Sequence, residues 1–309
     1  MNIKLLLHHP LQWLRDLQSS PSHKQAPSVA LVLSGGGARG LAQIGAIEEL
    51  QARGYHIHAV AGTSMGALVG GFFCCGKLGL LKTRVLSLKR KEVMQLIDFS
   101  IGLDHVATAD HLLTLMQQLL DNVRIENLPV NFCCCASDLT SGRERVFREG
   151  PLADAIRASI SIPGFFKPVR RGNEALVDGS VHNIFPLDRV ERKPGDMLIG
   201  INVSAPDSRP CNDYIDRNDE SVGRFLSWLR TVLPVGHRQL SANALNMALR
   251  VACLTLQNNT QVAMRLTPPD LCVNVPMDAF GLFDYERAAE IIAYGRRATA
   301  QALDQKLAP

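Results

Sequence analysis

The chain has few aromatic residues, little net charge and no long apolar run. Aromatic side chains make up 6% of its 309 residues, and the formal charge is +4 with the basic residues spread along the sequence. A small, dispersed charge gives no electrostatic footprint for nucleic acid, so we expect no nucleic-acid partner. Weak attraction to an anionic membrane stays open. No stretch of the sequence reaches the roughly 20 apolar residues of a membrane-spanning helix.

Secretion and metal-site signals are also missing. Residues 1–7 start like a targeting peptide, but His8, His9 and Pro10 interrupt them before an apolar region forms. Eight cysteines lie in short runs or alone, without the spacing of disulfide frameworks or zinc sites. We therefore expect a cytoplasmic protein with reduced thiols, no metal and no cofactor.

The patterns that are present predict an α/β fold. A hydrophobic fraction of 46% can fill a full core, and strand-like runs alternate with helical patterns. We expect an N-terminal extension and linker over residues 1–27. In it, residues 10–18 form an interfacial helix, form a helix packed on the domain, or are mobile. A single domain follows over residues 28–309, with its core motifs in 29–202 and a helical C-terminal part in 217–307.

Residues 62–66 read Gly-Thr-Ser-Met-Gly and have the pattern G-x-S-x-G. They follow an apolar, strand-like run at residues 57–61 and open an apolar, helix-like run at 67–75. A serine on a sharp strand-to-helix turn needs small neighbours, because the backbone packs closely there. The pattern indicates a nucleophile at Ser64. The alternative is a glycine-rich turn without chemistry.

A second glycine-rich turn comes earlier, after the apolar run at residues 29–33. Residues 34–40 read Ser-Gly-Gly-Gly-Ala-Arg-Gly and lead into a helical pattern that ends near Gly54. Residues 29–61 thus form a β-α-β unit, whose right-handed crossover makes its two strands parallel. The carboxyl ends of parallel strands lie on one edge of the sheet. We therefore expect the glycine turn and Ser64 to lie side by side.

This turn also matches the dinucleotide-binding pattern G-x-G-x-x-G. That interpretation requires an acidic residue about 20 positions further on, at the end of the second strand, where Ala61 stands instead. We favour an oxyanion hole made by successive backbone amides of this turn, at the N-terminus of the helix. Arg39 adds positive charge at this corner, unless it is a solvated residue of the first helical turn.

A carboxylate ends a later strand. Residues 174–177 are strand-like and run into Asp178-Gly179, which can bring the carboxylate to a neighbouring turn or can be an ordinary Asp-Gly β-turn. Further strands are expected at residues 130–136, 143–147, 196–203 and 271–275. Helices are expected at residues 105–120 and 240–257, and a final helix capped by Asp284 reaches Leu307.

Four segments taken together resemble the patatin-like phospholipases. They are the glycine turn at 35–40, the pentapeptide at 62–66, the stretch at 158–168, and Asp178-Gly179 followed by Asn183 and Pro186. The order and spacing of these segments cover about residues 29–202, and the combination is far more specific than any one part. Residues 280–285 also resemble the bacterial members of the family.

The resemblance implies a three-layer α/β/α fold with a mainly parallel central sheet. It also implies lipid acyl-hydrolase activity, a catalytic dyad of Ser64 and Asp178, and an oxyanion hole at residues 35–37. We expect substrate contacts from Met65, Phe165 and Phe166. The chain departs from the family at one visible position, since the family usually has Gly or Ala where Ser180 stands.

A Ser-His-Asp triad is the alternative to the dyad. His237 has the chain order of α/β-hydrolases, but that fold places several strands before its nucleophile, and here only one or two precede it. His182 follows Asp178 closely, so one loop would have to supply both groups. The dyad is the simpler hypothesis, with Asp178 accepting the serine proton.

Two further stretches have two interpretations each. Residues 77–91 are basic and form either a solvated face or a contact with anionic lipid. Residues 222–233 have a broad apolar side, which is either packed on the domain or part of an acyl-chain entrance facing a membrane or a second subunit. The sequence leaves the oligomeric state open.

We expect a serine acyl-ester hydrolase that releases fatty acid from phospholipid or lysophospholipid. Two other classes stay open. One is a small-ester or thioester hydrolase with the same site, and the other is a non-catalytic regulatory protein that keeps the fold.

Overall fold

The computed structural model describes residues 27–87, 110–120, 122–163, 166–209 and 242–307. Several expectations concern residues outside these ranges. They are the N-terminal extension, the part of the basic stretch after Ser87, the helix at 222–233, Phe165 and His237.

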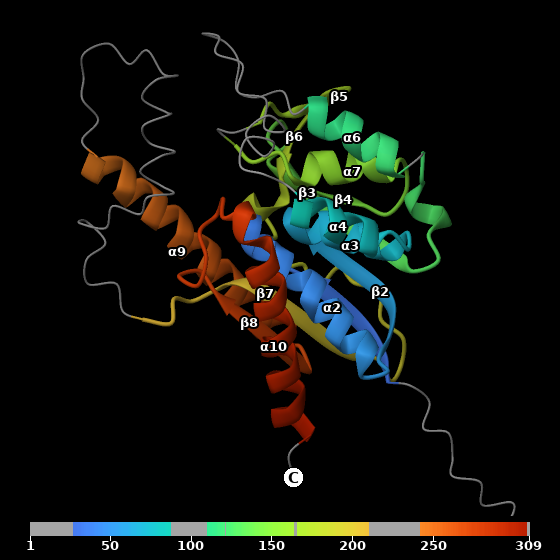
Figure 1. The fold of residues 1–309 in the computed structure, drawn as a ribbon. Helices are drawn as coiled ribbons and strands as arrows, with labels where there is room; N and C mark the ends of the chain where they lie inside the picture. The colour runs from blue at the N-terminus through green and yellow to red at the C-terminus, as the bar shows by residue number, and fades with distance from the viewer. Residues whose placement is uncertain (1–26, 88–109, 121, 164–165, 210–241, 308–309) are drawn as a thin grey trace, which may run out of the picture.

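An eight-stranded sheet forms the centre of the fold (Figure 1). The strands that pair in parallel are β1 Ser28–Leu33, β2 His56–Thr63, β3 Asn131–Asp138, β7 Met197–Ala205 and β8 Leu271–Pro276. An antiparallel edge is added by β4 Arg143–Phe147, β5 Val169–Arg171 and β6 Glu174–Asp178. The order is β5-β6-β3-β2-β1-β7-β8, and β4 also pairs with β3. The sheet is parallel at its centre and antiparallel at one edge.

Helices lie on both faces of this sheet (Figure 1). They are α2 Ala42–Ala52, α3 Met65–Cys74, α4 Leu78–Ser87, α6 Asp110–Leu120, α7 Leu152–Ser159, α9 Ala242–Leu266 and α10 Ala288–Leu307. Short 3₁₀ turns are η1 Gly37–Leu41, η2 Ile125–Asn127, η3 Gly179–Val181 and η4 Tyr285–Arg287. None of the helices in the described ranges is long and apolar enough to cross a bilayer.

Two hydrophobic cores, one on each face of the sheet, make the fold three layers deep. Along β1, Leu31 and Leu33 lie in the larger core with side chains of α2, α3 and α10, whereas Ala30 and Val32 lie in the smaller core with side chains of α9. This alternation follows from the period of two in a strand, and it explains why a strand buried on both faces is a continuous apolar run. The prediction of a three-layer α/β/α fold is confirmed.

Strands β1, β2 and β6 bring the sequence motifs to one edge of the sheet. The parallel register pairs Leu33 at the end of β1 with Gly62 near the end of β2. A Cβ placed on Gly35 would lie 3.2 Å from the Ser64 Cβ, so the glycine turn and the serine are neighbours as predicted. β3 continues past this edge, and its antiparallel partner β6 brings Asp178 opposite Ala136.

Three local expectations need correction. β5 is absent from the prediction because it has only three residues, too few for a periodic pattern. α9 runs to Leu266, past the expected end at residue 257, because its C-terminal part buries Thr260 and packs Met264 on the sheet. Asp284 occupies the N-cap position of η4, but its carboxylate accepts a hydrogen bond from the Gly281 amide (2.8 Å) instead of capping the following turn.

Candidate active site

Ser64 stands on a strained turn between β2 and α3. Its φ and ψ are 56° and −124°, in a region that non-glycine residues rarely adopt and that marks functional turns. The glycines on either side allow the backbone to approach closely. A Cβ on Gly62 would lie 2.4 Å from the Gly66 carbonyl oxygen, and one on Gly66 would lie 2.2 Å from the Leu33 carbonyl oxygen. The G-x-S-x-G spacing is therefore a packing requirement of this turn.

The Ser64 hydroxyl donates a hydrogen bond to the Asp178 Oδ2 atom at 2.6 Å. Both side chains are buried, with 5% of Ser64 and 3% of Asp178 exposed. Burial raises the pKa of Asp178, because the charged form loses solvation, while hydrogen bonds from Ser64 and Ser180 lower it in part. A carboxylate with a raised pKa is a better proton acceptor, and this one faces a hydroxyl at hydrogen-bonding distance.

The turn is held from behind by Ser159 at the end of α7. The Ser64 amide donates to the Ser159 Oγ atom (2.9 Å), and the Ser159 hydroxyl donates to the Cys135 carbonyl on β3 (2.7 Å). No supporting role for Ser159 was predicted from the sequence. Its only signal was membership of the family-like stretch at 158–168. The contact also means that the Ser64 amide is occupied in this structure.

The three glycine amides that were predicted as oxyanion donors differ in their hydrogen bonds. The Gly35 amide donates to the Ile184 carbonyl and the Ala38 amide to the Leu282 carbonyl, both at 2.9 Å. Within the described residues, no acceptor is assigned to the amides of Gly36 and Gly37. Of the predicted oxyanion donors, Gly36 and Gly37 remain candidates, whereas the Gly35 amide is already committed to the fold.

Arg39 is buried, and its guanidinium binds backbone carbonyls. Its Nε atom donates to the Val203 carbonyl (3.0 Å) and its Nη1 atom to the Phe280 carbonyl (3.2 Å). These bonds join η1 to the end of β7 and to the segment before α10. These bonds help to fix the glycine turn. The part of Arg39 in the oxyanion hole stays a prediction, whereas the alternative of a solvated residue is wrong.

The expected substrate contacts lie in buried positions. Met65 packs against Gly40, where a Cβ would lie 2.2 Å from the Met65 Cγ atom. Phe166 lies beneath the guanidinium of Arg157, 5.6 Å from its ring centroid. Phe165 lies outside the described residues. Contact of these side chains with a substrate stays a prediction.

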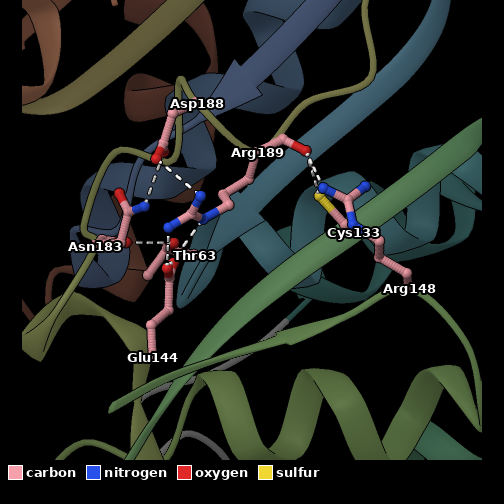
Figure 2. Close-up of polar contacts among 7 residues, drawn as sticks. All are labelled: Thr63, Cys133, Glu144, Arg148, Asn183, Asp188 and Arg189. Atoms are coloured by element: carbon pink, nitrogen blue, oxygen red, sulfur yellow. Dashed lines mark hydrogen bonds and ion pairs between the residues drawn. The ribbon is translucent and has the colours of Figure 1, made fainter. Parts of the chain in front are cut away.

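A polar network fixes the loop that follows Asp178 (Figure 2). The Thr63 hydroxyl, next to the nucleophile, donates to the Asn183 carbonyl (2.7 Å), and the Asn183 amide donates to Asp188 (3.1 Å). Arg189 pairs with Glu144 on β4 at 2.6 Å, and its carbonyl accepts bonds from β3 and from the segment after β4. These contacts tie the loop to β2, β3 and β4, and so fix the distance between Ser64 and Asp178.

His182, a candidate of the triad hypothesis, makes its hydrogen bond away from Ser64 and Asp178. His182 is exposed, and its Nε2 atom lies 3.1 Å from the Gly142 carbonyl in the β3–β4 turn. Ser64 and Asp178 bond each other directly, without an imidazole between them. Among the described residues, no group of histidine, cysteine and carboxylate side chains has the arrangement of a metal site.

Comparison with known proteins agrees with this geometry. A family model described as patatin-like phospholipase matches residues 31–190. The chain belongs to the patatin-like phospholipase family. An uncharacterised NTE family protein of Mycobacterium bovis is 30% identical to it over 90% of this chain and 92% of its own length. The lysophospholipase NTE1 of Debaryomyces hansenii is 25% identical over 87% of this chain, which matches 17% of that longer protein.

Similarity to solved structures is weaker for this member of the patatin-like family. VipD from Legionella pneumophila is 15% identical, with a TM-score of 0.43 over 91% of this chain and 67% of that one. This similarity is too low to carry an argument about the site.

The raised pKa of Asp178 makes the stability of this patatin-like site depend on pH. A carboxyl group whose pKa is raised on folding stabilises the protein below the pKa of the unfolded chain, about 3.9, and this contribution is lost as pH rises through the folded pKa. The Asp178→Asn variant has no carboxyl group at this position, so its stability does not fall with pH for this reason. We expect the melting temperature of the variant, relative to the parent protein, to rise between about pH 4 and pH 7. A difference that stays constant, or falls, between these pH values would contradict a buried carboxyl of raised pKa.

Proposed function

We propose that the protein is a serine acyl-ester hydrolase that releases fatty acid from phospholipid or lysophospholipid. The observation that carries the proposal is the 2.6 Å hydrogen bond from the Ser64 hydroxyl to Asp178, on a strained turn. Beside it lies a glycine loop with two amides that have no acceptor among the described residues. Nucleophile, base and oxyanion donors are the groups that acyl transfer requires. Membership of the patatin-like family supports the lipid class of the substrate.

The first half of the reaction acylates the serine. Asp178 accepts the Ser64 proton as the hydroxyl oxygen attacks the ester carbonyl, and the carbonyl oxygen becomes an oxyanion. The amides of Gly36 and Gly37 donate to this oxyanion. The intermediate collapses when the bond to the alcohol oxygen breaks, and Asp178 returns its proton to that leaving oxygen. The products are the free alcohol, a lysolipid or glycerophosphoester, and an acyl-enzyme.

The second half releases the fatty acid. Water takes the place of the alcohol and gives its proton to Asp178 as its oxygen attacks the acyl carbonyl. The same amides stabilise the second oxyanion. The bond to Ser64 then breaks, and the serine oxygen recovers the proton from Asp178. One ester and one water give one alcohol and one carboxylic acid, so no further co-reactant is needed.

Two alternatives remain: one differs from this proposal in its substrate, and the other lacks turnover. A small-ester or thioester hydrolase would cleave short soluble esters without preferring long chains or lipid aggregates. A non-catalytic protein would keep the fold without turning over any ester. We favour a lipid, because NTE1, which is similar to most of this chain, is named a lysophospholipase.

We also propose a peripheral, cytoplasmic placement, with α9 as the surface that meets lipid. Apolar side chains with exposed fractions of 40–78% follow one side of this helix: Met247, Val251, Leu254, Val262 and Leu266. Its 25 residues include no acidic residue, which suits an anionic surface. An ion pair between Arg250 and Asp207 (2.6 Å) anchors it just beyond the end of β7, at the edge that carries Ser64. The described cysteines are reduced, which suits a reducing compartment.

The nucleophile can be tested by one substitution. Ser64→Ala removes the attacking hydroxyl, so hydrolysis of lysophospholipid and of short esters should fall to background. Because the variant loses one oxygen atom and gains no bulk, its melting temperature should stay within a few degrees of that of the parent protein. Fatty-acid release and thermal unfolding are the measurements. Turnover within severalfold of the parent protein would contradict the mechanism. A parent protein that cleaves only short monomeric esters would favour the small-ester alternative.

The oxyanion loop can be tested at Gly36. A Cβ there would lie 2.6 Å from a Val203 methyl group and 3.0 Å from the Val203 carbonyl oxygen, so Gly36→Val must displace the turn. Loss of a donor should lower kcat by about 10²–10³-fold, or ~3 kcal/mol. Gly79→Ala is the matched control, because a Cβ at Gly79 meets nothing within 4 Å. Full activity of Gly36→Val would move the oxyanion hole to another donor, such as the Met65 amide.

The lipid-facing role of α9 can be tested with a matched pair. Met247 and Leu307 have exposed fractions of 61% and 69%, on α9 and at the end of α10. We expect Met247→Glu to reduce co-sedimentation with vesicles of anionic phospholipid severalfold, and Leu307→Glu to leave it unchanged, while both keep the hydrolysis of monomeric esters. Equal vesicle binding by the two variants would contradict the assignment.

A further inference from the structure

The antiparallel part of the sheet extends past the edge that carries Ser64. β2 ends at Thr63, whereas β3 continues past it to Asp138. β4 occupies one side of these last residues of β3, and β6 occupies the other side, where β2 has ended. Because Asp178 pairs with Ala136, the residues of β6 that precede Asp178 lie beyond the level of the candidate dyad.

We call residues 138–145 and 169–176 the basic arm. Its outermost strand pair is Arg171 with Glu174, which lies four residues before Asp178 and therefore about 14 Å from it along the strand. In Figure 1, β5 and β6 lie at the top of the view, beyond β3 and β4. The arm thus projects from the same edge of the sheet as the candidate site.

Exposed arginines stand at the end of this arm. They are Arg143, the first residue of β4, and Arg170 and Arg171, the last two residues of β5. In the described part of the chain, none of these three side chains has an ion pair or a hydrogen bond. Successive residues of a strand point to opposite faces, so Arg170 and Arg171 place a cation on each face of the arm.

The carboxylates of the arm are engaged within the structure. Asp138 is buried and accepts hydrogen bonds from three backbone amides of the arm, which also fix the turn between β3 and β4. Glu144 pairs with Arg189 at 2.6 Å, and Glu174 pairs with Arg145 at 3.7 Å. The three exposed arginines are therefore left to meet a charge from outside the chain.

Apolar side chains are exposed beside these cations. Leu139 in the turn between β3 and β4 is 56% exposed, and Val181 in the turn after Asp178 is 50% exposed. The His182 Nε2 atom lies 3.1 Å from the Gly142 carbonyl oxygen and joins these two turns. Cations beside exposed apolar side chains suit an anionic lipid surface, which offers phosphate and hydrocarbon together. Single-stranded nucleic acid would favour aromatic side chains for stacking, and the sequence of the arm has none.

We propose that the basic arm is a second membrane contact, which binds the phosphate groups of anionic phospholipids beside the candidate site. α9 meets the same edge of the sheet just beyond the end of β7, where Arg250 pairs with Asp207. The strand order places β2, and with it Ser64, between β7 and the arm on β3. Two contacts, one on each side of the nucleophile, direct that edge toward the bilayer. The inference rests on the proposed function, because it names the charge of the lipid surface that the same site meets.

The test measures co-sedimentation with vesicles of neutral phosphatidylcholine and with vesicles that also contain anionic phosphatidylglycerol. An arginine near an anionic surface contributes about a fivefold factor in binding, so the double variant Arg170→Gln/Arg171→Gln should bind anionic vesicles about tenfold or more weakly. Arg143→Gln, on another strand, should lose about fivefold and tests the arm independently if the double variant fails to fold. Binding to neutral vesicles should not change. Thermal unfolding checks the fold of each variant.

Arg297→Gln is the matched control. Arg297 is an exposed arginine near the middle of α10, a helix that packs on α2, where a Cβ on Gly295 would lie 1.9 Å from the Ala42 carbonyl oxygen. This variant should bind both kinds of vesicle like the parent protein. Equal anionic binding by Arg297→Gln and the arm variants would overturn the inference, as would an equal loss on neutral vesicles. Binding of the parent protein to an RNA oligonucleotide in place of anionic vesicles would also overturn it.

Hydrolysis of a short monomeric ester separates this inference from the proposed function. The arm variants should keep the kcat/KM of the parent protein on that ester, because the substituted arginines do not contact Ser64 or Asp178. Ser64→Ala should bind anionic vesicles like the parent protein. Unchanged vesicle binding by the arm variants, with turnover lost in Ser64→Ala, would remove this inference alone. Parent-like turnover of Ser64→Ala would instead remove the proposed function.

Discussion

A buried hydrogen bond between a hydroxyl and a carboxylate is the interaction around which the rest of this site is arranged. Asp178 loses solvation at this position, and burial raises its pKa. The fold tolerates that cost because the Ser64 hydroxyl and Ser180 donate to the carboxylate. Burial and this hydrogen bond also suit Asp178 to the proposed role of base, because a desolvated carboxylate 2.6 Å from a hydroxyl is well placed to accept its proton.

The sheet meets this requirement by close packing at one edge. Positions 35, 62, 66 and 179 are glycines whose missing Cβ atoms would lie within 2.5 Å of neighbouring atoms. These contacts bring the ends of β1, β2, β3 and β6 close enough for one hydroxyl to reach one carboxylate. Side-chain bonds from Ser159 and Thr63 then fix the turn from behind. The geometry of the proposed dyad thus depends on the backbone packing as well as on the two side chains.

The sequence predicted the parts of this site whose signal is local. A G-x-S-x-G turn, a glycine-rich turn after a strand and an aspartate at a strand end are each written in a few adjacent residues, and the β-α-β pattern was enough to place two of them together. Ser159 and Asn183 were missed as supports because their hydrogen-bond partners are brought to them by the tertiary fold. The bonds of Arg39 to two backbone carbonyls were not predicted, because a sequence gives the sign of a charge and not its direction.

The difference between local and tertiary signals also explains which strands could be predicted from the sequence. Long apolar runs gave the central strands, since a strand buried on both faces has a strong pattern. Strand β5 has three residues and owes its existence to pairing with β6, which no local pattern encodes. The commitment of the Gly35 amide to the Ile184 carbonyl likewise depends on a contact made across 149 positions of the chain, the difference between 184 and 35.

The most direct test of the account separates the carboxylate from the imidazole as the base. Asp178→Asn keeps the size of the side chain and removes its proton-accepting charge, whereas His182→Gln removes the nearest imidazole of the described loop. The measurement is kcat/KM of both purified variants on one monomeric ester. The account predicts a loss of about 10²–10⁴-fold or more in Asp178→Asn and most of the rate retained in His182→Gln. A loss in His182→Gln as large as that in Asp178→Asn would contradict it and make the imidazole the base.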